Sequence, residues 1–219
     1  MARKKNIKKT DLIKFFMDYY LEHSETPKSV HQFAKINNFH ERDFYTYYGS
    51  LRGLEKDIFQ NFFDQTVSLL VESDEYESFD PRNKLLSFYY TFFEILGANR
   101  SYVLLSLESG KSPLRSMKVL APIKKSFDEF IESIEIKTMD LKNDKLERFK
   151  KDSLKQTSWS QLLITLKFWL EDDSPSFEKT DLFIEKSIKA GFDLLDSAPL
   201  KSLVDLGKFL YHQKMTMNL

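Results

Sequence analysis

Apolar residues recur at helical spacing along almost the whole chain, and this pattern limits the fold more than any other feature. The clearest stretch has apolar side chains at i, i+3, i+4 and i+7: Trp159, Leu162, Leu163, Leu166, Trp169 and Leu170. No segment alternates apolar and polar residues convincingly, as a half-buried strand would. Only 6 Gly and 6 Pro occur in 219 residues, too few for the tight turns of an all-β protein. We therefore expect an all-α protein.

Composition narrows the class further. With 42% hydrophobic residues and 20 Phe, the chain can build a sizeable core without covalent crosslinks. The absence of Cys excludes disulfides, thiolate metal sites and cysteine nucleophiles. The basic start lacks the apolar core of a signal peptide, and the longest uncharged run, residues 156–166, is far shorter than the roughly 20 residues that span a bilayer. We expect a soluble, cytoplasmic protein that does not insert into membranes.

The first 71 residues have the clearest local signals. Residues 1–9 form a basic arm, and an amphipathic helix follows that should end near His23. Ser29 and Gln32 have the spacing of a capping box that opens a short second helix. Asn37-Asn38 should end that helix, with Asn38 in the left-handed region. A third short helix is expected over 40–47, and a long one over 51–71 after a Gly49-Ser50 turn.

The rest of the chain predicts further helices separated by polar segments. Residues 72–80 should form a loop, and Asp80-Pro81 should cap a helix that is apolar on nearly all sides and therefore buried. The remaining expectations are helices over 101–108 and 114–136, and a loose lysine-rich connection with a helical turn over 137–156. A further helix should end at Glu171-Asp172-Asp173, another should be opened by Ser174-Pro175, and a last helix is expected over 200–212.

The helix after Ser174-Pro175 has two apolar faces. One face comprises Phe177, Ile184, Ile188, Gly191 and Leu195, and the other Phe183, Ser187, Ala190 and Leu194. Two faces need two partners, which we interpret as the core of the chain itself and a second copy of the chain. Small residues would let helices approach closely. The residues predicted for this homodimer interface are Trp169, Ile184, Ser187, Ile188, Gly191 and Leu195.

The three N-terminal helices, with a tight turn between the second and third, are typical of a helix-turn-helix domain. The segment from Lys28 to Phe39, followed by residues 44–50 and Leu54, resembles the N-terminal domain of TetR-family transcriptional regulators. The pairing of Phe33 with Ala34, and the Tyr45 and Tyr48 ending of the third helix, carry this resemblance. Residues 168–170 and 174–181 are also similar to a subgroup of TetR-like proteins from Bacteroidetes.

The resemblance implies a regulator that binds a palindromic operator in double-stranded DNA as a homodimer. It implies a helix-turn-helix domain over 1–50, a connecting helix over 51–71, and a ligand-binding and dimerisation domain over 72–219. Ser29 would cap the second helix and touch phosphate, Tyr45 would also meet phosphate, and residues 40–45 with Tyr47 would face the major groove. The predicted DNA-binding residues are Lys28, Ser29, His40, Arg42, Tyr45, Tyr47 and Arg52.

Aromatic residues of the larger domain could line a pocket for a small apolar ligand. The residues predicted for it are Tyr89, Phe92, Phe93, Tyr102, Phe127 and Trp159. A plain aromatic core is the alternative explanation. The four His residues lack paired metal spacing, and no nucleophile elbow, Walker A or dinucleotide-binding motif occurs. We therefore expect no enzymatic activity, no metal and no cofactor.

Charge leaves a second function open. Lys and Arg number 33 and so do Asp and Glu, but residues 1–60 contain 11 basic and 8 acidic residues, a net charge of +3. Without the five basic residues of the arm this region has a net charge of −2. Glu41 and Asp43 lie in the expected recognition helix, and Leu51 occupies the place where the family usually has Lys. The alternative is a TetR-fold protein that no longer reads DNA and instead binds a lipid or isoprenoid and a protein partner.

Overall fold

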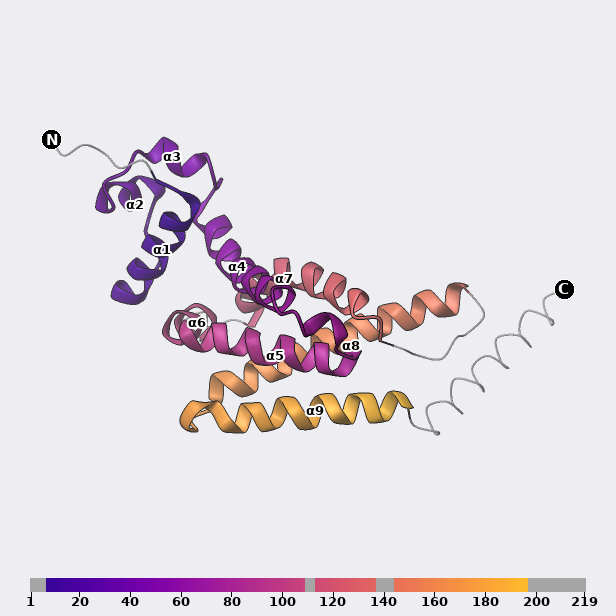
Figure 1. Cartoon of the computed structure of the whole chain (residues 1–219). Coiled ribbons are helices and arrows are strands. Elements are labelled where there is room, and N and C mark those ends of the chain that lie inside the picture. Colours follow the sequence, from indigo (N-terminus) through magenta and orange to yellow (C-terminus); the bar gives the residue numbers. More distant parts are fainter. Residues whose placement is uncertain (1–6, 109–112, 137–143, 197–219) are drawn as a thin grey trace. The chain divides into compact units, whose positions relative to one another are not determined.

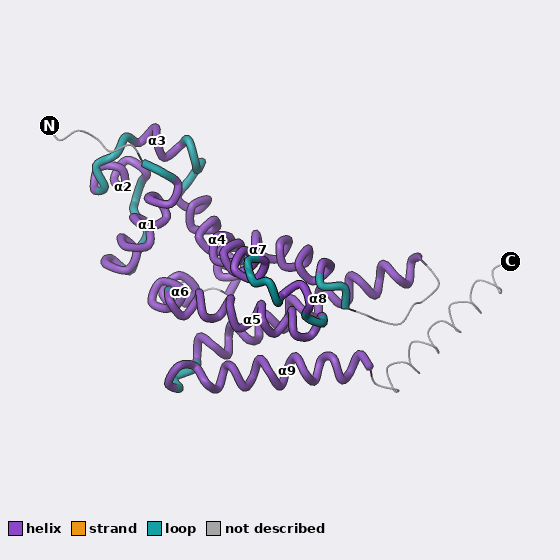
Figure 2. Tube along the Cα trace, viewed as in Figure 1, coloured by secondary structure: helices purple, strands orange, loops and turns teal. Residues whose placement is uncertain are grey.

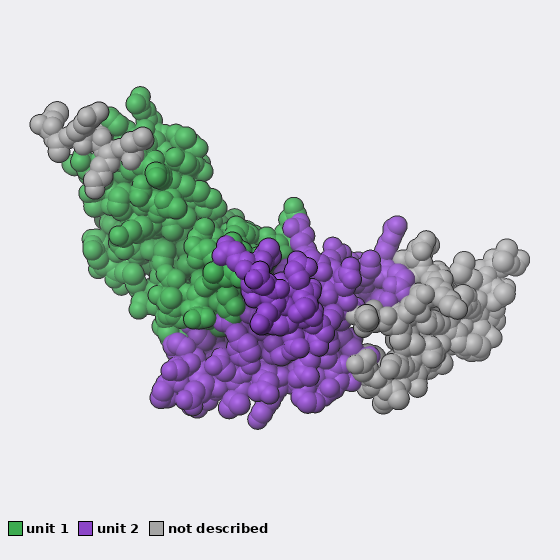
Figure 3. Space-filling model, viewed as in Figure 1, with its two compact units in different colours: residues 1–69, 91–126 green, residues 70–90, 127–219 purple. Residues whose placement is uncertain are grey.

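The computed structural model describes residues 7–108, 113–136 and 144–196 of the chain. Within these ranges every secondary-structure element is a helix (Figures 1 and 2). The all-α fold expected from the apolar spacing is therefore confirmed. The chain divides into two compact units, which we call unit 1 (residues 1–69 and 91–126) and unit 2 (residues 70–90 and 127–219; Figure 3). The domain boundaries expected at 50 and 71 remain a prediction.

Unit 1 begins with three helices whose ends follow the local sequence signals. They are α1 (Lys9–His23), α2 (Val30–Ile36) and α3 (Glu41–Tyr45). Ser24 ends α1 in the left-handed region with φ 54°, and Asn38 has φ 55° in the turn before α3, as expected. The third helix is shorter than the 40–47 predicted for it, because His40 is its N-cap residue and Thr46 its C-cap residue.

Four further helices contribute to unit 1. They are α4 (Leu51–Val71), the C-terminal half of α5 (Pro81–Ala98), α6 (Arg100–Glu108) and the first part of α7 (Pro113–Ser133). Aromatic rings link α1, α2, α3 and α6 into one core. The ring of Phe33 lies edge-on to those of Phe16, Phe39 and Phe44, and Tyr20 of α1 meets Tyr102 of α6 at 5.8 Å. All six rings are at most 2% exposed.

A polar cluster around Asp57 joins α4 to the first helices. The Tyr48 hydroxyl donates to Asp57 Oδ2 at 2.7 Å, and Lys9 Nζ lies 2.8 Å from the same oxygen. Burial, followed by the hydrogen bond and charge of Asp57, raises the pKa of the Tyr48 phenol. Lys9 therefore belongs to α1 and to this cluster, which corrects the expectation of a free basic arm reaching residue 9. Residues 1–6 of that arm lie outside the described residues.

Unit 2 contains the 3-10 turn η1 (Tyr76–Ser78), the first half of α5, the end of α7, α8 (Asp144–Glu171), the 3-10 turn η2 (Pro175–Phe177) and α9 (Glu178–Asp196). Helices α8 and α9 pack side by side (Figure 1). Phe88 of α5 lies 4.5 Å from Phe130 and 5.5 Å from Phe127 of α7, and Phe127 reaches Trp159 of α8 at 6.1 Å. These rings form the aromatic centre of the unit.

Two expectations for this half of the chain are wrong. The lysine-rich stretch over 137–156, expected to be a loose connection with one helical turn, is continuously helical from Asp144 onward, as the start of α8. Ion pairs within α8 and to α7 support this polar part: Lys150 with Glu147 at 2.6 Å and Lys155 with Glu132 at 2.7 Å. Helix α5 is not buried on all sides, because Tyr90 is 40% exposed. The helix predicted over 200–212 lies outside the described residues.

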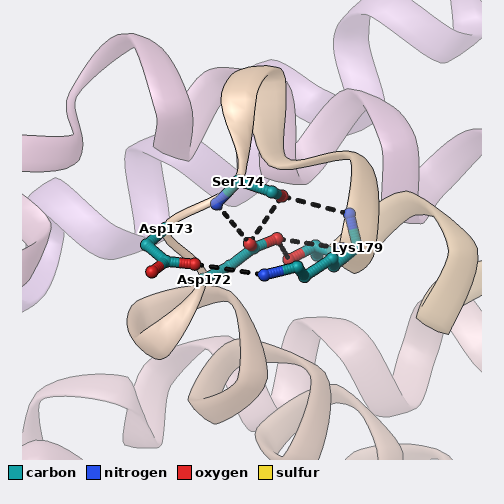
Figure 4. Close-up of polar contacts among 5 residues, drawn as sticks. Asp172, Asp173, Ser174 and Lys179 are labelled. Atoms are coloured by element: carbon teal, nitrogen blue, oxygen red, sulfur yellow. Dashed lines mark hydrogen bonds and ion pairs between the residues drawn. The ribbon is translucent and has the colours of Figure 1, made fainter.

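The turn between α8 and α9 is organised by the carboxylate of Asp172, which is only 6% exposed (Figure 4). Its Oδ1 accepts from the backbone N–H and hydroxyl of Ser174, and its Oδ2 accepts from the same two groups of Thr180, at 2.6–2.9 Å. Burial raises the pKa of Asp172, but these four bonds outweigh it and lower the pKa to about 2. Asp172 therefore shares with Ser174 the capping of α9 that the sequence assigned to Ser174 alone.

We predict that Asp172→Asn destabilises the protein by about 1–3 kcal/mol at pH 7, because an amide cannot accept all four hydrogen bonds. The pKa of the folded carboxyl lies below its ordinary value of 3.8, so its contribution is present above that pH and is lost as the pH falls through about 2. Urea unfolding of both proteins between pH 7 and pH 2 measures this. Asp173→Asn is the matched control, because the side chain of Asp173 is 92% exposed. Equal losses in the two variants would contradict the role of Asp172.

A second prediction concerns the Asp57 cluster. Tyr48→Phe removes a hydrogen bond to a half-buried carboxylate and should lower the free energy of unfolding by about 1–2 kcal/mol. Tyr47→Phe is the control on the adjacent residue: its ring is 43% exposed and its hydroxyl reaches only Ile7 O at 3.4 Å. This change should stay within about 0.5 kcal/mol. Urea denaturation at neutral pH separates the two, and equal effects would contradict the anchoring role of Tyr48.

Candidate nucleic-acid interface

Helix α2 begins with a cap at Ser29. The Ser29 Oγ accepts from the backbone N–H of Gln32 at 3.1 Å, which satisfies one of the free N–H groups of the first turn. The side chain of Gln32 does not return to Ser29 as in a reciprocal capping box; its Oε1 accepts from the backbone N–H of Lys28 at 3.0 Å. Lys28 and Ser29 are both exposed beside this cap. The start of α2 therefore presents a lysine and a helix N-terminus to solvent.

The turn between α2 and α3 is closed by backbone and amide hydrogen bonds. The N–H of Phe39 donates to Ala34 O at 3.0 Å, and Asn37 Nδ2 donates to Phe33 O at 3.0 Å. Asn38 takes the left-handed conformation that Asn adopts more readily than most residues. Two short helices joined by such a turn form a helix-turn-helix, with Phe39 and Phe44 buried beneath it.

Phe44 of α3 is buried and Glu41 and Asp43 are half-buried, which corrects the expectation that all of residues 40–45 face the major groove; the residues named for DNA contact are exposed. Phe44 is fully buried, whereas Tyr45 is 54% exposed and Tyr47, just after the helix, is 43% exposed. His40 and Arg42 are also exposed. These four side chains, together with Lys28, Ser29 and Arg52 at the start of α4, are the seven predicted DNA-binding residues. All seven are exposed in unit 1, and their contact with DNA remains a prediction.

The two acidic residues of α3 have partners close by. Glu41 Oε1 accepts from the Tyr45 hydroxyl at 3.3 Å, and Glu41 Oε2 lies 3.3 Å from His31 Nδ1 on α2. Asp43 lies 3.4 Å from Arg42 Nε. Loss of solvent, followed by the charge and hydrogen bond of Glu41, raises the pKa of Tyr45. The i, i+4 spacing of Glu41 and Tyr45 in the sequence predicts their contact. The contact of Glu41 with His31 joins two helices, so no pattern of neighbouring residues predicts it.

The start of α4 departs from the family pattern as the sequence indicated. Ser50 Oγ accepts from the N–H of Gly53 at 3.1 Å and so caps the helix. Leu51 is half-buried and Arg52 is exposed beside it. The cation at this helix start is therefore displaced by one residue from the place where the family usually has Lys.

The six residues predicted for a ligand pocket are distributed over both units. Phe92, Phe93 and Tyr102 belong to unit 1, whereas Tyr89, Phe127 and Trp159 belong to unit 2. Five of the rings are at most 5% exposed, and Trp159 is half-buried. They are packed against other rings, such as Tyr102 against Phe59 and Tyr20. A ligand site formed by these residues remains a prediction.

The residues predicted for the dimer interface separate into buried and accessible groups. Trp169, Ile184 and Ile188 are at most 1% exposed, which places them in the core of unit 2 and removes them from the surface available to a second chain. Ser187 and Leu195 are half-buried, and Gly191 is exposed, with no atom within 4 Å of the position that a Cβ would take. Sequence spacing identified the apolar residues of α9 but not which of its two faces the chain itself covers.

Neither a metal centre nor a membrane-spanning helix is found among the described residues. No group of three or more of their His, Asp or Glu side chains is placed to hold a metal ion. No helix in the same ranges is long and apolar enough to cross a bilayer.

Comparison with known proteins identifies the family. The family model described as "Tetracyclin repressor-like, C-terminal domain" matches residues 84–210. No curated protein gives a significant match to the chain. The family match covers more than half of the 219 residues, and the helix-turn-helix lies before it in the chain. The chain therefore belongs to the TetR family of tetracyclin repressor-like proteins.

Proposed function

We propose that this protein is a cytoplasmic transcriptional regulator that binds a palindromic DNA operator as a homodimer and is controlled by a small apolar ligand. The observation that supports this most directly is the exposure of all seven predicted DNA-binding side chains around the α2–α3 turn. The similarity of residues 168–170 and 174–181 to a Bacteroidetes-type subgroup is part of the same proposal.

The exposed residues divide by chemistry into two roles. Lys28 and Arg52 would neutralise phosphates, Ser29 would donate a hydrogen bond to a phosphate oxygen, and the exposed ring of Tyr45 would lie against the DNA backbone, which positions a protein on DNA without reading its sequence. Arg42 and His40 would face base edges in the major groove, where Arg pairs with guanine through two hydrogen bonds. Residues 1–6, which include three of the basic side chains, would add sequence-independent attraction.

Control by a ligand needs a mechanical link to the DNA-binding helices, and unit 1 supplies contacts of the right kind. The Tyr20 hydroxyl of α1 donates to Leu105 O of α6 at 3.4 Å, and the Ser106 hydroxyl of α6 donates to buried Glu55 of α4 at 3.3 Å. Close-packed interiors transmit displacement. A ligand that moved α6 would therefore move α1 and α4, and so change the spacing of two headpieces on an operator.

One face of the α8–α9 pair supports the proposed homodimer. Phe168 and Phe183 stack at 4.8 Å, and Gln161 Nε2 donates to Ser187 Oγ at 3.0 Å. Beside them Ile164 is 57% exposed and Leu194 is 61% exposed, and the small residue Ala190, on the same face of α9, is also exposed. Apolar and small side chains on one surface suit close packing against the same surface of a second copy. We assign the interface to this face.

The alternative function keeps one observation in its favour. Without the basic arm, the first 60 residues have a net charge of −2. A domain of that charge has weak long-range attraction for DNA. A TetR-fold protein that holds a lipid or isoprenoid and binds a protein partner would not need that attraction.

We predict that the protein retains a specific fragment from its own genome in a mobility-shift assay, with affinity that falls steeply with salt. Arg42→Ala with Tyr45→Phe should weaken specific binding about 5- to 150-fold, because one base contact of this kind contributes roughly 1–3 kcal/mol. Arg148→Ala, an exposed arginine on α8, is the control and should leave affinity unchanged. If wild-type protein retains no fragment at low salt, the regulator is excluded, and native mass spectrometry for copurified lipid tests the alternative.

We also predict a dimer in sedimentation at micromolar concentration. Leu194→Glu places a charge on the proposed face and should shift the protein toward monomer, because burying an unpaired charge is costly. Leu182→Glu is the matched control on the same helix: Leu182 is 52% exposed but lies about 120° around the helix axis from Leu194. A monomeric wild type, or equal dissociation of the two variants, would contradict the interface.

A further inference from the structure

The recognition helix α3 has little intrinsic stability. It contains five residues, and its N-cap residue, His40, makes no side-chain capping bond. Isolated helices shorter than about 12 residues are marginal in water, so tertiary contacts must hold α3 in place. The buried ring of Phe44 holds its inner side against Phe33. The outer side, which carries the DNA-facing residues, needs contacts of its own.

Glu41 supplies such contacts on the outer side. It lies in the first turn of α3, where a carboxylate interacts favourably with the helix dipole. One of its oxygens accepts from Tyr45, one turn further along, and the other meets His31 on α2. When His31 Nδ1 carries a proton, it donates to this carboxylate. Glu41 therefore connects α2, the start of α3 and the end of α3.

The contact with Tyr45 matters because that ring is 54% exposed and could otherwise rotate freely. Its edge-to-face contact with Phe44 at 5.6 Å restrains the ring, and the hydrogen bond to Glu41 fixes its hydroxyl end. Immobilising a side chain on binding costs about 0.5–1.5 kcal/mol. A ring that is already restrained in the free protein avoids part of that cost.

Glu41 can affect DNA binding in two opposite ways, and the sign of the change in DNA affinity when it is replaced distinguishes them. If its charge dominated, removing the acid would strengthen binding to phosphates. If its contacts dominate, removing them would weaken specific binding. We propose that Glu41 is a positioning residue for operator recognition: it restrains the ring of Tyr45 and, through His31, ties the start of α3 to α2 in the arrangement in which α3 meets DNA. This inference rests on the proposed function.

The test compares Glu41→Ala with Glu41→Gln on the full-length protein. A glutamine can accept from Tyr45 and donate to a neutral His31, so it keeps both contacts while removing the charge. Glu22→Ala is the control for charge alone, because Glu22 is an exposed acid on α1. Affinities for the genomic fragment that wild type retains, and for a scrambled fragment of equal length, are measured at several salt concentrations.

The expected result is a loss of about 2- to 10-fold in specific affinity for Glu41→Ala, with affinity for the scrambled fragment equal or higher. Glu41→Gln should bind the specific fragment at least as tightly as wild type. Specific binding by Glu41→Ala that equals or exceeds that of wild type overturns the proposal, as does an equal loss in both substitutions.

Hydrogen exchange without DNA separates this inference from the proposed function. Amides of residues 43–45, the first of which donates to His40 O, should exchange faster in Glu41→Ala than in wild type, and at the wild-type rate in Glu41→Gln. Unchanged exchange in Glu41→Ala overturns the positioning role even where DNA binds. If the wild-type protein retains no DNA, the proposed function is wrong, and so is the role of Glu41 in operator recognition. Hydrogen exchange still decides in that case whether Glu41 stabilises α3.

Discussion

The burial of Phe44 is the interaction on which the DNA-facing surface depends. A helix of five residues does not persist alone, and its one fully buried side chain lies edge-on to Phe33 at 6.2 Å. Phe33 also meets Phe16 and Phe39, so the position of α3 is set by the same rings that hold α1 and α2 together. The exposed residues of the recognition helix are placed by a core that none of them enters.

Helix α4 connects the helix-turn-helix to the other helices of unit 1 through polar contacts. Asp57 binds Lys9 and Tyr48 on the side of the first helices, and Glu55, two residues earlier and so about 200° around the helix, binds Ser106 of α6. Gln60 donates to Ser126 of α7 at 2.9 Å. Directional polar contacts of this kind fix the rotation and register of a helix, whereas apolar packing alone tolerates small shifts. Helix α4 is therefore held by polar contacts on the side of the first helices and on the side of α6 and α7.

The features that the sequence predicted well depend on residues that are close together in the sequence. The cap at Ser29, the left-handed Asn38 and the Asp80 cap before Pro81 each depend on contacts within a few positions, and the structure contains all three. The features it missed depend on distant partners. The polar start of α8 has no apolar periodicity, and its Lys155 pairs with Glu132 on another helix. The two apolar faces of α9 were visible, but only packing shows that Ile184 and Ile188 face the core.

The same distinction applies to charge. A count of acids in the recognition helix suggests weak DNA binding, because it treats Glu41 and Asp43 as independent negative charges near phosphate. In the folded chain Asp43 lies beside Arg42, and Glu41 lies between His31 and Tyr45. Each acid thus has a partner within about 3–4 Å and does not face the DNA as an isolated charge. The net charge of a segment therefore does not establish the sign of the effect that one of its acids has on binding; the geometry around that acid does.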